Sequence, residues 1–309
     1  MITSVFKKST PLNFTLVVFL ILVFFSIYQF QDFSWTNSTI LIFEKVGIIA
    51  VLLASIFMTN FISKRNGLSK DSSYTILFYF LFLLFFPSVL DNINLVFSNF
   101  FILLALRRLI SLQSLKASKE KIFDASLWIF LASLFHFWSI LYIALVFISI
   151  IFHVARDYRN WILPFIAFIT AGIIFILFSI VFNIDAQGYI NRSVMTNFEI
   201  NYFTNNYQNG ALSIYATVVL FFVISLFATL SNRPLVLHAS FKKIIASFFI
   251  GVLIYLVSSN KSNDILIFTI APLAIMATSH IEIPQVKLKK EMVLFVLIAC
   301  SFFAFFSQL

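Results

Sequence analysis

ASLWIFLASLFHFWSILYIALVFISIIF, the stretch from Ala125 to Phe152, contains no Asp, Glu, Lys or Arg. As one α-helix it would be about 42 Å long, whereas the hydrocarbon core of a bilayer is roughly 30 Å thick. As two segments that meet near His136, each half is short for a crossing. The path of this stretch therefore decides on which side of a membrane every later loop lies. It also decides whether His136 lies in mid-membrane or at a membrane surface.

The composition predicts the fold class before any motif is considered. Hydrophobic residues make up 61% of the 309 residues and charged residues 11%. These values predict an all-α, polytopic transmembrane bundle of about 10 to 11 membrane segments, with residues 1–309 as a single transmembrane domain. The net charge of +9 does not indicate a nucleic-acid partner, because the cytoplasmic loops of membrane proteins accumulate Lys and Arg. The single Cys300 excludes an intrachain disulfide and a cysteine-based metal cluster, and we expect no metal and no cofactor.

The apolar segments follow one another with short polar connections. They span residues 14–30, 41–62, 74–90, 95–112, 122–135, 137–153, 162–182, 211–230, 244–258, 265–279 and 292–307. The first follows Lys7 and Lys8 and resembles a signal anchor. Because no small-residue cleavage site comes after it, we expect it to be retained. The longest connection, residues 183–210, is the longest expected extracytoplasmic loop.

The basic residues discriminate between the two paths of the His136 stretch. If the amino terminus is cytoplasmic and the stretch crosses twice, all of the 21 Lys and Arg except Lys45, Arg192 and Lys261 lie inside. A single crossing inverts every later loop and divides the basic residues almost evenly. Orientation follows the excess of positive charge in short loops, which favours the two-pass path. Since FHFWS offers no Gly, Pro or Asn for a tight turn, we expect a re-entrant or kinked hairpin at His136, shielded by other helices.

On this topology the outer face carries an Asn/Tyr-rich loop that could bind sugars. Residues 183–210 contain IDAQGYINRSVMTNFEINYFTNNYQNG. Amide groups offer paired donors and acceptors, and Tyr rings offer apolar faces, which match the hydroxyls and C–H faces of a glycan. The candidate substrate-binding residues are Tyr189, Asn191, Tyr202 and Tyr207. The alternative is a solvated loop in an Asn-rich protein.

His136 is the candidate catalytic residue with the strongest physical argument. On a helix, Ser133, His136 and Ser139 recur at a three-residue spacing and form a narrow polar stripe. An ionisable residue at membrane depth is a functional candidate, because isolated burial of a polar ring is unfavourable there. The imidazole could act as a general base towards a sugar hydroxyl, or orient a phosphate when protonated. The alternative is a neutral histidine bonded to a neighbouring helix or to lipid headgroups.

Arg107 and Arg108 follow an apolar stretch, 95–106, that is too short to span a bilayer alone. We expect the two side chains to reach towards the cytoplasmic headgroups while the helix continues through residues 109–115. Anchoring at the cytoplasmic face is one role for them. A paired site for a lipid phosphate is the other.

Two resemblances extend this interpretation. MITSVFKKSTPLNF, TNFISKRNGLSKDSSYTILFYFLFLLFFPS, LRRLISLQSLK and HVARDYRNW resemble an uncharacterised family of polytopic inner-membrane proteins from Flavobacteria and other Bacteroidota. This resemblance covers most of the chain and implies no assigned chemistry.

The second resemblance is local. ASLFHFWSILYI resembles the A-x-x-x-H-x-S-x-L pattern of EpsG/Wzy-type polysaccharide polymerases, which join lipid-linked glycans at the outer face of the cytoplasmic membrane. The pattern falls on Ala132, His136, Ser139 or Trp138, and Leu141, and it implies that His136 lies near such a site. The chain departs from the family at Asn99, where Phe100 follows instead of an Arg soon after.

These observations lead to two hypotheses. In the first, a multi-pass protein of the bacterial inner membrane transfers or polymerises a polyprenyl-pyrophosphate-linked glycan. His136 is then the base or orienting group, Arg192 stabilises the departing phosphate, and Asp32 or Asp185 is an alternative base. In the second, the chain is a non-enzymatic subunit, a scaffold or transporter component, of an envelope machine. The expected partners are membrane lipids, a polyprenyl-linked glycan and another small membrane protein subunit.

Overall fold

The structure is a computed structural model that describes residues 2–183, 185–196, 206–259, 261–284 and 286–309. The first half forms α1 (Ile2–Phe6), α2 (Pro11–Gln29), α3 (Thr39–Arg65), α4 (Tyr74–Leu83), α5 (Ile93–Ile110), α6 (Ser118–Phe135) and α7 (Ile143–His153). The second half forms α8 (Arg159–Val181), α9 (Ala186–Ser193), α10 (Asn206–Leu230), α11 (Leu235–Val257), α12 (Ile267–Glu282) and α13 (Lys287–Ser307). The 3-10 turns are η1 (Ser34–Asn37), η2 (Pro87–Asp91), η3 (Ser111–Ser114), η4 (Phe137–Tyr142) and η5 (Asn263–Leu266).

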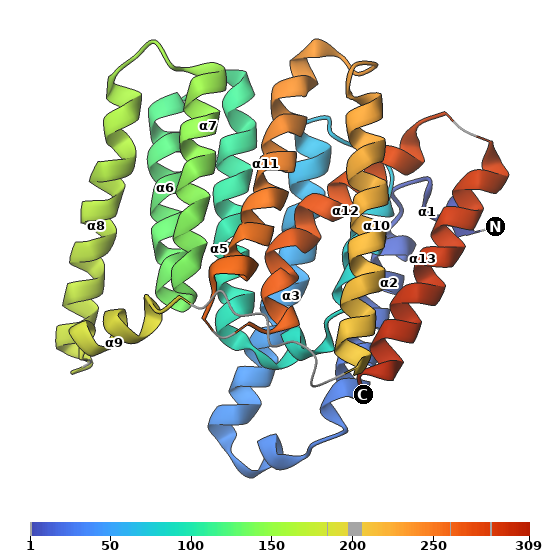
Figure 1. Cartoon of the computed structure of the whole chain (residues 1–309), viewed down its shortest axis with the longest axis horizontal. Helices are drawn as coiled ribbons and strands as arrows, with labels where there is room; N and C mark the ends of the chain where they lie inside the picture. The colour runs from blue at the N-terminus through green and yellow to red at the C-terminus, as the bar shows by residue number, and fades with distance from the viewer. Residues whose placement is uncertain (1, 184, 197–205, 260, 285) are drawn as a thin grey trace.

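The long helices run side by side between two ends of the molecule (Figure 1). Within the described ranges, eight helices are long and apolar enough to cross a membrane, and Tyr74–Leu83 and Phe137–His153 form two shorter apolar helices. The prediction of an all-α polytopic bundle is confirmed. The chain is thus a multi-pass membrane protein by the length and composition of its helices.

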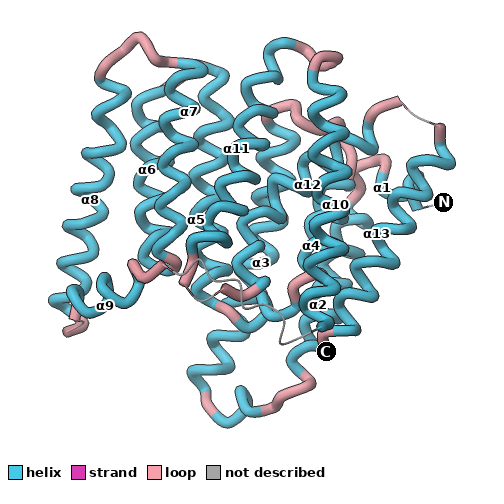
Figure 2. The backbone as a smooth tube through the Cα atoms, in the orientation of Figure 1, coloured by secondary structure: helices cyan, strands magenta, loops and turns pink. Residues whose placement is uncertain are grey.

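The His136 stretch forms an antiparallel hairpin, as the charge distribution predicted. Helix α6 runs to Phe135, and η4 with α7 returns alongside it to the same end of the bundle (Figure 2). An ion pair fixes this arrangement, because Lys119 Nζ, at the start of α6, lies 3.2 Å from Asp157 Oδ2, after α7. The backbone N–H of Arg159 and the ammonium of Lys119 hold the pKa of Asp157 below its usual value. The carboxylate is therefore charged in this pair across the physiological range.

The turn needs neither Gly nor Pro because one residue makes the break. His136 has an extended backbone (φ −140°, ψ 106°) between helical residues on both sides. Its N–H donates to Ala132 O at 3.1 Å and its carbonyl accepts from Ser139 N at 3.0 Å, so the backbone groups at the break keep partners. Any L-residue can adopt this conformation, so the sequence carries no turn signal.

Reporter fusions test the hairpin directly. Because Lys119 pairs with Asp157, the two ends of the hairpin lie together, and a reporter fused after Asp157 is expected on the same side as one fused after Lys116, before α6, and opposite to one fused after Ser262. The excess of Lys and Arg predicts that the shared side is the cytoplasm. An opposite-side signal for Asp157 relative to Lys116 would refute the hairpin.

The two ends of the bundle differ in charge. We call the end where α3 meets α4, α5 meets α6 and α12 meets α13 the basic end. Contacts across loops define it: Ser72 Oγ donates to Glu282 Oε1 at 2.6 Å, and Arg233 Nη2 donates to Ser279 O at 2.9 Å. The opposite, His136 end joins α6 to α7 and α11 to α12. The described basic side chains Lys45 and Lys261 belong to this second end.

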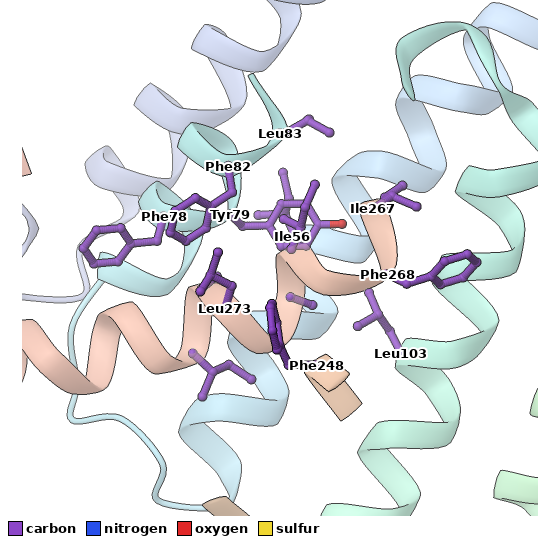
Figure 3. Packing of buried hydrophobic residues seen from close by; sticks show 14 of the residues in the cluster. Ile56, Phe78, Tyr79, Phe82, Leu83, Leu103, Phe248, Ile267, Phe268 and Leu273 are labelled. Atoms are coloured by element: carbon purple, nitrogen blue, oxygen red, sulfur yellow. The ribbon is translucent and has the colours of Figure 1, made fainter. Parts of the chain in front are cut away.

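Helices α4 and α12 form the centre of the bundle. Every residue of α4 is buried, and almost all of α12 is as well. Figure 3 shows Phe78, Tyr79 and Phe82 of α4 near Leu273 of α12, with Ile56 of α3 close by. A helix that is apolar on all sides is stable only where other helices surround it, which agrees with this central position.

Three boundaries differ from the predicted segments. The segment predicted at 74–90 ends as α4 at Leu83, because Pro87 begins a separate turn and Phe86 before it leaves the helical region. The loop predicted at 183–210 contains α9 and the start of α10. The segment predicted at 244–258 begins at Leu235, so Lys243, predicted in a cytoplasmic loop, lies fully buried inside α11.

Candidate functional site

A polar pocket lies around His136 at the His136 end of the bundle. Its volume is about 300 Å³. Most of its lining is polar or aromatic and comes from the ends of α5, α6 and α11. The residues with polar groups are Asn92, Asn94, His136, Trp138, Ser193, Ser258, Ser259 and Ser262. We call this cavity the His136 pocket.

The hydrogen bonds of Ser258 assign the proton of His136. The imidazole Nε2 lies 3.2 Å from Ser258 Oγ, and the same hydroxyl donates to Ile254 O at 2.7 Å. Since a serine hydroxyl has one proton to donate, Ser258 accepts from His136, whose Nε2 carries the hydrogen. In the neutral ring Nδ1 is then the basic nitrogen. The ring also packs against Phe268, at 5.7 Å between centroids, which fixes its orientation.

Two carboxylates lie close to the His136 pocket, each with its own partners. Asp264 is only 5% exposed, and its Oδ2 accepts from Asn92 Nδ2 at 2.9 Å. Ser262 Oγ donates to Asp264 as well. Asp91 forms an ion pair with Lys45. These bonds tie η2 to η5 and hold the side of the pocket that Asn92 and Ser262 line.

An apolar groove adjoins the pocket on the side of α8. Its volume is about 260 Å³, and it lies between α6, η4, α8 and α9. Aromatic and aliphatic side chains dominate its walls, among them Phe130, Leu134, Phe168, Phe175 and Tyr189. Phe137 and Ser193 line both cavities, so the groove and the pocket are neighbours that share part of their walls. We call it the α6–α8 groove.

The Asn/Tyr-rich loop approaches the site through α9. A backbone bridge joins Thr196 to Ser258, and Trp138 Nε1 donates to Met195 O at 3.3 Å. Tyr189 lines the groove, with its hydroxyl donating to Leu134 O, the carbonyl near the end of α6. The structure therefore places the predicted residue Tyr189 in the α6–α8 groove near the end of α6, and Tyr189 does not line the His136 pocket itself.

Two other predicted substrate-binding residues that the structure describes, Asn191 and Tyr207, do not line the pocket. Asn191 is exposed on α9, and Tyr207, in the first turn of α10, is 64% exposed. Tyr202 lies outside the described residues. The backbone of Arg192 belongs to α9, but its side chain is also outside what the structure describes.

The two candidate alternative bases have local structural partners. Asp32 accepts from Ser34 N and Ser34 Oγ, both at 2.8 Å. These bonds, with the charge of Lys45, hold its pKa below the usual value. Asp185 caps α9 by accepting from Gly188 N at 3.0 Å. Neither residue lines the His136 pocket.

Arg107 and Arg108 lie in the last turn of α5 at the basic end. The guanidinium of Arg108 pairs with Asp124 Oδ2 at 2.8 Å, and that of Arg107 stacks 4.8 Å from the ring centre of Phe61. Both cations therefore have partners within the bundle. A lipid-phosphate role for them stays a prediction.

Sequence reasoning did not single out the serines of the pocket. Ser258, Ser259 and Ser262 belong to the stretch SSNKSND, which follows the apolar part of α11. Its density of Ser and Asn at a helix end was a usable signal. Nothing in the sequence indicated that this stretch meets His136, which is 122 residues away from Ser258.

Comparison with known proteins identifies a family without assigned chemistry. A profile described as "Family of unknown function (DUF6427)" matches residues 5–309. No curated protein and no solved structure matches the chain. The match covers nearly the whole bundle, and any assignment of chemistry rests on the geometry of the His136 end.

Proposed function

The chain belongs to this family of unknown function, and from the site itself we propose that it binds a polyprenyl-pyrophosphate-linked glycan at the His136 end and transfers or polymerises it. In this proposal the His136 end faces the extracytoplasmic side of a bacterial inner membrane. The excess of Lys and Arg at the basic end supports that orientation.

The observation that carries the proposal is that the His136 pocket and the α6–α8 groove lie side by side and share Phe137 and Ser193. A lipid-linked glycan has a polar head and a long apolar chain, and the two cavities differ in the same way. Asn, Ser and Trp side chains suit hydroxyls and C–H faces of sugars, while Phe130, Phe168 and Phe175 suit an isoprenoid chain. Phe137 and Ser193 mark the place where head and chain would join.

In this proposal His136 acts as the general base. The acceptor hydroxyl oxygen would bond to the anomeric carbon of the donor, and its proton would pass to Nδ1 of His136. The bond between the anomeric carbon and the pyrophosphate oxygen would break, and the polyprenyl pyrophosphate would leave with the electron pair. Ser258 would keep Nε2 protonated and the ring in place. We propose Arg192 as the cation for the leaving group.

Substitution of His136 tests the catalytic role. His136→Gln is expected to reduce polymer formation by about 100-fold or more, which is the usual contribution of general acid–base catalysis, while the protein accumulates normally. The matched control is His238→Gln, since His238 lies at the basic end and bonds Arg233 O. Surface glycan length in cells and turnover by purified protein are the two measurements.

Filling the groove tests binding of the lipid part. A Cβ on Gly172 meets nothing within 4 Å, so Gly172→Leu can fold while narrowing the α6–α8 groove. Purified in nanodiscs, this variant should lose affinity for the polyprenyl-linked glycan but not for the same glycan without its lipid. Normal surface glycan in both His136→Gln and Gly172→Leu cells, together with a stably co-purifying membrane protein, would favour the non-enzymatic subunit instead.

A further inference from the structure

A second polar pocket lies at the basic end, on the opposite side of the membrane from His136. Its volume is about 440 Å³. Four lysines line it: Lys7, Lys70, Lys287 and Lys290. They come from three regions of the chain, namely the segment after α1, the α3–α4 connection and the first turn of α13. We call this cavity the four-lysine pocket.

Hydrogen bonds across these three regions build the pocket. Tyr74 Oη donates to Thr3 O at 2.5 Å, and Ser73 N donates to Phe6 O at 2.9 Å, so α1 is fixed against α4. Thr3 N donates to Glu291 Oε1 at 3.2 Å, which fixes α1 against α13 as well. The lysines are thus brought together by a braced framework. They are not a run of neighbours in sequence.

The positive charge of the four-lysine pocket exceeds the negative charge of its lining, four lysines against one glutamate. Its one carboxylate, Glu282, accepts from Lys70 N at 2.8 Å and from Ser72 Oγ at 2.6 Å. Within the described ranges, none of the four ammonium groups lies within 4.0 Å of a carboxylate oxygen. Three other cations at this end form ion pairs: Lys64 with Asp71, Arg108 with Asp124, and Lys119 with Asp157.

The lysines are also close enough to repel one another. Lys290 lies within electrostatic reach of both Lys7 and Lys70, and Glu282 offsets part of this repulsion. Like charges that converge on a cavity raise the free energy of the folded protein unless an anion occupies it. Ser72 lines the same cavity, but its hydroxyl proton is donated to Glu282, so the lysine ammonium groups are the donors that would hold an anion there. Ammonium groups form charge-assisted hydrogen bonds to phosphate oxygens.

We propose that the four-lysine pocket binds a phosphate group with two or more negative charges. Such a group is carried by an anionic lipid headgroup in the adjacent leaflet or by a soluble phosphate compound. Basic pockets between membrane helices are known to hold the phosphates of anionic lipids, and the position at the bundle end allows either source. The site is separate from the glycan site proposed at His136, and neither requires the other.

Two probes distinguish the sources in full-length protein reconstituted in phosphatidylcholine nanodiscs. Native mass spectrometry counts retained phosphatidic acid, and calorimetry measures inorganic pyrophosphate. The variant Lys70→Gln/Lys290→Gln removes two pocket charges, and the Lys70 N–H that bonds Glu282 is retained. Its matched control, Lys242→Gln/Lys289→Gln, removes two charges at the same end from residues that do not line the pocket.

The expected result is a loss of at least about 10-fold in affinity for one probe in the pocket variant, and little change in the control. A loss for phosphatidic acid identifies a lipid as the source, and a loss for pyrophosphate identifies a soluble ligand. In the unmodified protein, the affinity for that same probe should fall as the ionic strength rises. Equal losses in both double variants, or binding of neither probe by the unmodified protein, would overturn the proposal.

Discussion

Gly251→Leu is expected to prevent accumulation of folded protein. Gly251 lies in α11 where this helix crosses α12, and a Cβ there would lie 3.0 Å from Thr269 Cγ2 and 3.1 Å from the backbone carbon of Phe268. The second contact is backbone, which cannot rotate away. Since α12 is almost wholly buried, it has no free space into which it can move. A leucine side chain therefore forces α11 and α12 apart.

The size of the substituent should set the size of the effect. Overpacking by small groups typically costs about 1–3 kcal/mol, so Gly251→Ala should lower the thermal midpoint of the purified protein even though alanine favours a helix by about 1 kcal/mol. Gly251→Leu should lower the free energy of unfolding by more than about 4 kcal/mol, which is enough to unfold a marginally stable protein. Fluorescence-detected size-exclusion chromatography after heating measures both variants.

Gly172→Ala provides the control, because it is the same change in a helix where no atom lies within 4 Å of the added carbon. It should leave the midpoint unchanged or raise it slightly. Equal destabilisation by the two alanine substitutions would contradict the close crossing of α11 and α12. Phe268 also packs on His136, so Gly251→Ala should disturb the His136 pocket while Gly172→Ala should not.

The path of the chain was predictable from sequence because loops of a membrane protein must carry its charges. The distribution of Lys and Arg predicted that 125–152 turns back at His136, and the ion pair between Lys119 and Asp157 confirms the hairpin. Apolar segment length predicted most helices for a similar reason. The Lys and Arg distribution and the length of apolar segments both indicate whether a residue lies in the membrane or in water, and a single sequence is enough to infer this.

The neighbours of each helix were not predictable in this way. His136 meets Ser258, and Asn92 meets Asp264 from 172 residues away, through helix packing that hydropathy does not encode. The same limit explains the assignment of Lys243 to a loop. A charged residue normally ends an apolar segment. Lys243 can lie inside the bundle because α5 and α7, packed against α11, supply its hydrogen-bond partners.

The partners of Lys243 are unusual for a buried cation. Its side chain is fully buried, and Nζ donates to Leu109 O at 2.7 Å. His153 Nε2 lies 3.1 Å from the same nitrogen, and because an ammonium has no acceptor, the histidine accepts and carries its own proton on Nδ1. The described carboxylates form no ion pair with it. The cation is thus held by two neutral acceptors.

Lys243→Asp is expected to abolish folded protein, whereas Lys243→Met should be tolerated. The shorter carboxylate would replace a donor that faces Leu109 O and leave a new charge buried in an apolar crossing, at a cost of roughly 3 kcal/mol or more. Methionine keeps the length and removes the desolvation of a charge but leaves Leu109 O and His153 Nε2 without their donor, so the protein should fold with a thermal midpoint lowered by less than Lys243→Asp lowers it. Lys242→Asp makes the same charge change at an exposed neighbour and should accumulate normally. Accumulation of Lys243→Asp at the level of Lys242→Asp would show that Lys243 is solvated, because only burial makes the two positions differ.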